Sequence, residues 1–246
     1  MRKILHFDEI DSTNNYLLHY VPAPDEDETV VVTDFQTGGR GQGSNRWESE
    51  RGKNLLFSVL IHPVWMAPSE QFYLSMAGAL ALKDVLDEIT TGISLKWPND
   101  VYWHDCKLSG TLIETKVGQN RLRDCVFGVG LNVNQQHFRS DAPNPVSLRQ
   151  IVEHTLPFDE LLEKILQRFE YRIQQLRNGD KEGIHAAYCA ALYRSGERHL
   201  YALPDGRKFY GTLETVEPAG RLCLSVETEQ GLERQWFAFK EVQFVI

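Results

Sequence analysis

Cysteine is scarce in this sequence, and the few cysteines are not arranged as a metal or redox motif. The chain has four cysteines among 246 residues, and no two of them form a CxxC pair. Wide spacing of this kind is typical of reduced thiols in a cytosolic protein and argues against a structural zinc site. We therefore expect a cytoplasmic location.

Long hydrophobic runs are also missing. No apolar stretch approaches the roughly 20 residues that a helix needs to cross a bilayer. The first residues, MRKILHFD, are too polar for a secretory signal. We therefore expect a protein that makes no membrane contact.

An excess of positive charge is absent as well. The formal net charge is −8, whereas non-specific binding to nucleic acid depends on neutralising phosphates with Lys and Arg. No helix-turn-helix pattern precedes residue 29, and the sequence has no internal repeats. Together with 42% hydrophobic and 24% charged residues, this composition predicts a globular protein that binds no nucleic acid.

The most unusual stretch that is present is the sequence GGRGQGSNRW at residues 38–47. It lies between two runs, 29–33 and 54–61, whose β-branched and apolar residues predict strands. Glycines let a backbone approach a ligand closely, while two arginines and a tryptophan supply anion contacts and an aromatic face. The stretch is either a mobile surface loop or a loop that orders over an anionic ligand, and composition alone leaves both open.

A second candidate ligand contact is the sequence DSTN at residues 11–14. Asp11, Ser12 or Thr13 can cap a helix that we expect to run to about residue 20. The same hydroxyls and free amides can instead hold a polar group of a small ligand. Both interpretations stay open on the residues alone.

The densest chemistry surrounds the sequence KWPND at residues 96–100. The proline stops a strand, so that Asn99 and Asp100 project at a turn. Lys107 then begins the next strand, and Gly110 lies inside that strand, where glycine is favoured if something must approach the backbone. These residues form either an ordinary hairpin with an exposed edge lysine or a site for a carboxylate or phosphate.

A further expected strand, 125–134, carries a GxG pattern at Gly128 and Gly130. It lacks the third glycine and the following helix of a dinucleotide-binding fingerprint. The loop at 38–47 does not match a P-loop either. We expect instead a strand whose backbone lies against a flat ligand, with Asn132 facing that ligand.

The remaining patterns predict helices up to about residue 195 and short strands after it. The expected helices are 68–92, 159–178 and 181–193, and the stretch 135–157 is expected to be mostly loop. Beyond residue 195, short alternating runs separated by turn residues predict a small β-barrel. Its expected strands are 198–203, 208–216, 222–228, 235–239 and 242–246. We therefore expect two domains, at residues 1–194 and 195–246.

In their order along the chain, these motifs closely resemble those of biotin protein ligases. The resemblance covers residues 11–134 through DSTN, the GRG…W loop, KWPND, KxxG and GxGxN. It implies an α+β fold, in which a mixed, mostly antiparallel sheet with flanking helices is related to class II aminoacyl-tRNA synthetases and is followed by a small C-terminal SH3-like β-barrel. It also implies the short form of the family, which lacks the N-terminal DNA-binding domain of some members.

The resemblance implies an ATP-dependent ligase that works in two steps. Biotin is first activated as biotinyl-5′-AMP with release of pyrophosphate, and is then transferred to a lysine of a biotin carboxyl carrier protein. ATP, Mg²⁺ and biotin are the expected small molecules, although no acidic cluster in the sequence indicates the magnesium ligands. A homodimer is a further option, because sheet-edge dimers occur in the family. Two alternatives stay open: a lipoate–protein ligase of the same fold, and a non-catalytic biotin-sensing module.

The resemblance also assigns roles to individual residues. Lys107 would contact both the biotin carboxylate and the α-phosphate, where charge builds during activation. Arg40 would contact the carboxylate, and Asp100 would orient the incoming lysine or accept its proton. The implied biotin site comprises Ser12, Thr13, Asn14, Gln36, Gly39, Arg40, Lys107 and Gly110. The implied ATP and adenylate site comprises Gln42, Trp47, Asn99, Lys107 and Asn132.

The loop at 38–47 departs from many family members because it contains few arginines. The sequence QGSN at 42–45 stands where a more arginine-rich stretch is common, and only Arg46 adds charge. We expect the loop to order when ligand binds and to shield the anhydride from water, but its composition predicts weaker retention of that intermediate. In some members an arginine near the C-terminus approaches the phosphates, and Lys240 is the nearest candidate here.

Overall fold

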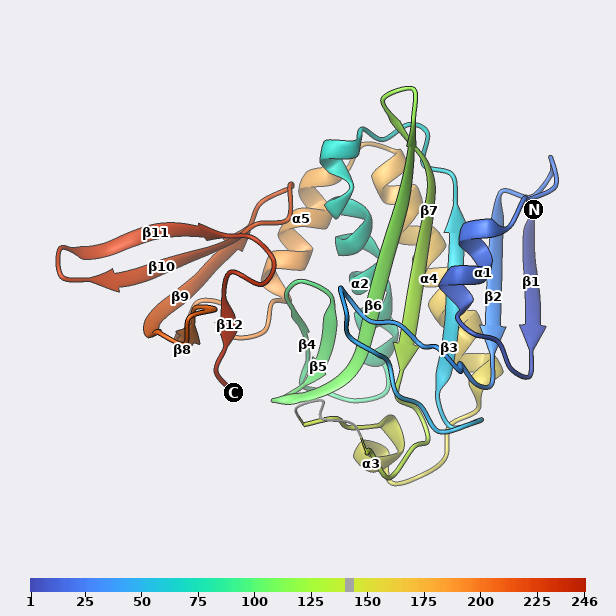
Figure 1. The fold of residues 1–246 in the computed structure, drawn as a ribbon, viewed down its shortest axis with the longest axis horizontal. Helices are drawn as coiled ribbons and strands as arrows, with labels where there is room; N and C mark the ends of the chain where they lie inside the picture. Colours follow the sequence, from blue (N-terminus) through green and yellow to red (C-terminus); the bar gives the residue numbers. More distant parts are fainter. Residues whose placement is uncertain (140–143) are drawn as a thin grey trace.

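The computed structural model describes residues 1–139 and 144–246, which form two β-sheets and five α-helices (Figure 1). The strands of the larger sheet are β1 Arg2–Phe7, β2 Glu28–Thr33, β3 Leu55–Ile61, β4 Ile93–Lys96, β5 Asp100–Trp103, β6 Cys106–Gly118 and β7 Arg121–Leu131. Their order across the sheet is β1-β2-β3-β7-β6-β5-β4. Strands β1 and β2 run parallel and the other neighbours are antiparallel, which confirms the expected mixed, mostly antiparallel sheet.

Helices cover both faces of this sheet. They are α1 Thr13–His19, α2 Phe72–Leu86, α3 Leu148–Val152, α4 Phe158–Arg177 and α5 Lys181–Ala190. Figure 1 shows α1 on one face and α2 and α4 on the other. Because side chains alternate along a strand, Val30 and Val59 join the large core under α2 and α4. Val31 and Leu60 point the other way and pack with Leu17 of α1.

The C-terminal part is a separate antiparallel sheet. Its strands are β8 Arg198–Ala202, β9 Lys208–Val216, β10 Leu222–Thr228, β11 Gly231–Phe237 and β12 Gln243–Phe244, in the order β11-β10-β9-β8-β12. This sheet lies beside β4 and β5 (Figure 1), and Trp97 Nε1 donates a hydrogen bond of 2.9 Å to the carbonyl of Gly220 across the junction. A five-stranded C-terminal sheet is thus confirmed, whereas the domain division at residues 194 and 195 stays a prediction.

Several element boundaries differ from those expected. Helix α2 ends at Leu86 rather than near residue 92. The β-branched residues at 89–91 have low helix propensity, and Ile89 packs against the core from the turn that follows the helix. Strand β1 was not expected. The stretch 135–157, expected to be loop, contains α3, which Ser147 starts through a capping box with Gln150; residues 140–143 of that stretch lie outside the described ones.

The helices show no pattern of a membrane span. None of those in the described part of the chain is both long enough and apolar enough to cross a bilayer.

Candidate active site

One cavity of about 200 Å³ lies where α1, the loop at 38–47 and strands β5, β6 and β7 meet. Most of the site residues expected from the sequence line it. These are Ser12, Thr13, Asn14, Gln36, Arg40, Gln42, Trp47, Asn99, Asp100, Lys107 and Gly110. Gly39 and Asn132 lie outside its lining. Residues separated by almost a hundred positions in the chain are therefore brought to one place.

The N-terminus of α1 forms one side of the cavity. Ser12 caps the helix, because its hydroxyl accepts a hydrogen bond from the amide of Asn15 at 3.4 Å. The capping interpretation of Ser12 is therefore confirmed, and Ser12 also lines the cavity. Capping and ligand contact are compatible at this residue.

A buried polar network extends from α1 to the middle of β3. Gln36 Oε1 accepts hydrogen bonds from the amide and the hydroxyl of Thr13, at 2.8 and 3.2 Å. The hydroxyl of Ser58 lies 2.7 Å from Thr13 Oγ1 and 2.6 Å from Asn14 Oδ1. Ser58 was missed in the sequence, where the only signal was a lone hydroxyl in an otherwise apolar run. The network orients the side chains of Thr13, Asn14 and Gln36.

Three glycines make room on the strands that form the floor. A Cβ on Gly130 would lie 2.3 Å from the indole of Trp47, and one on Gly110 would lie 3.0 Å from it. A Cβ on Gly128 would lie 2.1 Å from Asn14 Oδ1. The strand backbone is therefore approached closely by Trp47 and Asn14 of the protein itself. Contact between this backbone and a flat ligand stays a prediction.

The loop at 38–47 folds into a small hairpin above this floor. The amide of Gly41 donates to the carbonyl of Asn45 at 2.8 Å, and the amide of Trp47 donates to that of Gly39 at 3.0 Å. Gly39 therefore serves the hairpin. The buried atoms Gln42 Oε1 and Trp47 Nε1 find no hydrogen-bond partner among residues 1–139 and 144–246. Both remain available to a ligand, since buried polar groups are normally paired.

An ion pair occupies the other end of the cavity. Lys107 Nζ lies 2.7 Å from Asp100 Oδ1, and both side chains are largely buried. Lys107 Nζ also lies 5.7 Å from the centre of the Trp47 ring. Asn99 is held at the preceding turn because its Nδ2 donates to the carbonyl of Thr111 at 2.6 Å. The turn connects β4 to β5, and the pair spans β5 and β6, so three strands that follow one another in the chain bring these residues together.

Arg40 lies at the cavity wall, and its guanidinium pairs with Glu114 of β6. Arg40 Nη1 donates to Glu114 Oε1 at 3.1 Å and Nη2 donates to Oε2 at 2.5 Å. Such two-point contacts fix an arginine in both position and plane. Glu114 was not recognised in the sequence as part of the site.

Lys96 is a second lysine in the cavity lining. Its Nζ lies 5.0 Å from the ring centre of Tyr102 and 5.1 Å from that of Phe244 in β12. Burial lowers the pKa of Lys96, partly opposed by the negative charge of Asp100. The sequence placed Lys96 in a motif but gave it no role.

The C-terminal sheet also reaches the cavity. Phe239, in the segment between β11 and β12, belongs to its lining. The next residue, Lys240, has a φ of 70°, and its Nζ lies 2.9 Å from where a Cβ on Gly43 would stand. Lys240, which lies between β11 and β12 of the C-terminal sheet, therefore meets the 38–47 loop.

Asn132 is not brought into the cavity. It follows β7, is buried, and donates from Nδ2 to the carbonyl of Val146 at 3.1 Å. Its Oδ1 has no partner within the described part of the chain. Contact between Asn132 and an adenylate stays a prediction.

Comparison with known proteins shows similarity to biotin and lipoate protein ligases. A profile of the biotin/lipoate A/B protein ligase family matches residues 6–132. The biotin–[acetyl-CoA-carboxylase] ligase of Mycobacterium tuberculosis is 33% identical over 223 residues, which cover 87% of this chain and 80% of that protein. The bifunctional ligase/repressor BirA of Bacillus subtilis is 29% identical over 218 residues, which cover 85% of this chain but 65% of that protein.

A solved structure is similar over both sheets. The biotin protein ligase from Aquifex aeolicus, in complex with biotin and ATP, superimposes with a TM-score of 0.79 and 26% sequence identity. The match covers 99% of this chain and 99% of that chain. The similarity therefore includes the C-terminal sheet as well as the sheet that carries the cavity.

Proposed function

The chain belongs to the biotin/lipoate A/B protein ligase family, and we infer that it is a biotin protein ligase. It activates biotin with ATP and attaches it to a lysine of a biotin carboxyl carrier protein. The observation that carries this inference is the single cavity shared by α1, the 38–47 loop and the Lys107–Asp100 pair. Hydrogen-bonding groups for a small acid thus lie next to cations suited to a phosphate.

The reaction needs two steps because a carboxylate does not acylate an amine at neutral pH. In the first step an oxygen of the biotin carboxylate attacks the α-phosphorus of ATP, a new O–P bond forms, and pyrophosphate leaves. In the second step the carrier lysine attacks the acyl carbon, an amide forms, and AMP leaves. The amine loses a proton in this step, so a nearby acceptor accelerates it.

We assign the central role to Lys107. Its ammonium group would bridge the biotin carboxylate and the α-phosphate, holding two negatively charged reactants together and stabilising the charge that builds between them. Asp100 now neutralises Lys107 at 2.7 Å. When the anions bind Lys107, Asp100 becomes available to orient the carrier lysine and accept its proton.

The biotin site would lie at the α1 end of the cavity. Thr13 and Gln36 are held by the Ser58 network, so they offer fixed partners to a polar ring such as the ureido group. Ser12, Asn14 and Gly110 would complete this site, and Gly39 would support it through the hairpin. Such groups fixed in advance lower the entropy cost of binding.

The adenylate would lie under the loop. Trp47 offers an aromatic face and an unpaired Nε1, and Gln42 offers an unpaired Oε1. Asn99 would face the phosphates. Asn132, which follows β7, would contact the adenylate. Lys96 and Lys240 would add positive charge for the polyphosphate, a role that the arginine-poor loop leaves unfilled.

Other parts of the proposal concern partners and surroundings. Mg²⁺ would enter with ATP; within the described ranges no three His, Cys, Asp or Glu side chains converge as a metal site. A homodimer would use the outer edge of β1, which borders only β2 in the sheet. The free thiols are compatible with a cytoplasmic location.

The experiment that tests the first step is ATP–pyrophosphate exchange with purified protein. We expect exchange that depends on biotin and is not supported by lipoate. Exchange with lipoate but not biotin would move the chain to lipoate–protein ligation, and exchange with neither acid would remove the enzyme assignment.

A further inference from the structure

We propose that Glu114 is a positioning residue that anchors the 38–47 loop through Arg40 and links loop closure to the biotin site. This inference rests on the proposed function and deepens it. Glu114 lies on β6, seven residues beyond Lys107, outside every motif of the sequence.

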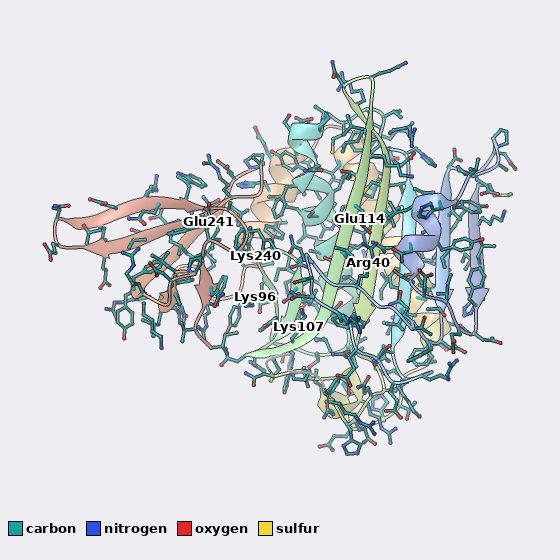
Figure 2. The ribbon with its side chains drawn as sticks, in the orientation of Figure 1. Arg40, Lys96, Lys107, Glu114, Lys240 and Glu241 are labelled. Atoms are coloured by element: carbon teal, nitrogen blue, oxygen red, sulfur yellow. The ribbon has the colours of Figure 1, made fainter. Side chains whose placement is uncertain are left out.

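The contact between Glu114 and the loop has two points. Both Nη atoms of Arg40 donate to the two carboxylate oxygens, at 3.1 and 2.5 Å, and the two side chains are labelled in Figure 2. Most of the backbone hydrogen bonds of residues 38–47 are internal to the hairpin. The ion pair therefore adds a charged tie between the hairpin and the sheet, beside the packing of Trp47 on Gly110 and Gly130.

The same carboxylate reaches the biotin side of the cavity. Asn14 Nδ2 donates to Glu114 Oε2 at 2.9 Å and to the carbonyl of Leu112 at 3.1 Å. Glu114 Oε2 thus accepts hydrogen bonds from both Arg40 and Asn14. Asn14 follows Thr13 in α1 and accepts from Ser58 through its Oδ1. A ligand that orders this end of α1 therefore also orders the carboxylate that holds the loop.

Anchoring does not prevent Arg40 from binding a ligand. The ion pair uses two of the five N–H donors of the guanidinium, and Arg40 still lines the cavity. Glu114 fixes the plane of the guanidinium so that the remaining donors face one direction. Without this anchor, Arg40 would have to be ordered by the ligand itself, at an entropic cost.

An ordinary surface ion pair would contribute little to order. The distinguishing feature here is that the acceptor is shared between the loop and the ligand site. The C-terminal sheet offers a matched control: Arg198 and Glu227 form a two-point pair between β8 and β10, with neither residue in the cavity lining.

The test is limited digestion with trypsin, followed at the bond after Arg46, with and without saturating biotin. In the wild-type protein we expect biotin to slow this cleavage. In Glu114→Gln we expect cleavage with biotin bound to be about threefold or more faster than in the wild type, and AMP release in the absence of carrier to rise relative to pyrophosphate exchange. Glu227→Gln should behave as the wild type in both measurements.

Glu114→Asp provides a second variant, because it keeps the charge but shortens the reach. We expect it to fall between wild type and Glu114→Gln, and a thermal melt of each variant checks that it is folded. If biotin protects both variants as fully as the wild type and neither releases additional AMP, the anchoring role is overturned. Failure of the proposed function would appear separately, as absence of biotin-dependent exchange in the wild-type protein.

Discussion

Lys107 Nζ and Asp100 Oδ1 are 2.7 Å apart at the end of the cavity that faces Trp47. They come from neighbouring strands in which Asp100 pairs with Gly110. The carboxylate holds the ammonium group in place until an anionic ligand competes for it. The residue that would bind the reacting anions is therefore held beside the residue that would receive the carrier lysine.

The first prediction concerns this pair. Lys107→Ala should reduce biotin-dependent pyrophosphate exchange by about 10²-fold or more, because a fixed cation is lost where charge develops. Asp100→Asn should reduce transfer of biotin to the carrier more than it reduces pyrophosphate exchange, because Asp100 acts in the second step. Lys116→Ala, at the far end of β6, is the control. Exchange at the wild-type rate in Lys107→Ala would remove Lys107 from the mechanism.

The second prediction concerns the floor under Trp47. Gly130→Ala places a methyl group 2.3 Å from the present position of the indole, so the loop must lift away. We expect kcat/KM for carrier biotinylation to fall by about tenfold, a change of about 1.4 kcal/mol. In Gly38→Ala the new Cβ makes an ordinary contact of 3.4 Å, and activity should be retained. Equal activity of the two variants would show that Trp47 need not dock on this floor.

The third prediction concerns pH. Burial lowers the pKa of Lys96 below the ordinary lysine value of 10.5, so its positive charge is lost at a lower pH than usual as the solution becomes alkaline. If this charge binds the phosphates of ATP, the KM for ATP should rise over that pH range in the wild type. Lys96→Arg should shift the rise to higher pH, because arginine stays protonated. Identical pH profiles for the two proteins would argue against phosphate contact by Lys96.

The lowered pKa of Lys96 also affects the stability of the folded protein. The folded protein disfavours charged Lys96, so this cost is fully present below the lowered pKa and disappears as the pH rises towards the unfolded value. Lys96→Met should therefore stabilise the fold at neutral pH, by about 1 kcal/mol after the loss of the aromatic contacts is included. Thermal unfolding at neutral pH measures this, and a lower Tm would contradict the burial argument.

The fourth prediction concerns the C-terminal sheet. Lys240→Met should raise the KM for ATP about fivefold and leave the affinity for biotin unchanged, because Lys240 meets the loop near Gly43 rather than near α1. Lys208→Met removes a similar charge from β9 and serves as the control. An equal effect of the two substitutions on KM would indicate a general loss of charge.

Local sequence patterns were sufficient to predict some residues of the site but not the others. Asp100 and Lys107 belong to the hairpin of β5 and β6, so their proximity follows from the short connection at residues 104–105 and the pairing of these two strands. Ser58 is marked only as a lone hydroxyl in an apolar strand, and Glu114 lies in a strand that gives no local sign of its contacts. Their roles depend on α1 and the loop packing across β3 and β6, which is a property of the tertiary fold.

The loop at 38–47 also makes contacts that its own sequence does not predict. Its glycines and Trp47 indicated a close approach to a ligand, which stays a prediction, whereas the structure shows Trp47 packed closely on Gly110 and Gly130 of the sheet. The sequence could not show that Lys240, about two hundred positions later, meets this loop, because no pattern in the chain relates the two segments. Sheet packing alone brings them together.

The assignment as a biotin ligase is tested most directly by the mass of a biotin carboxyl carrier domain incubated with this protein, ATP and either biotin or lipoate. We expect the carrier to gain one biotinyl group on a single lysine, with ATP required, and lipoate to give no change. An unmodified carrier alongside biotin-dependent pyrophosphate exchange would indicate a module that forms the adenylate without transferring it. A carrier modified only by lipoate would contradict the assignment as a biotin ligase.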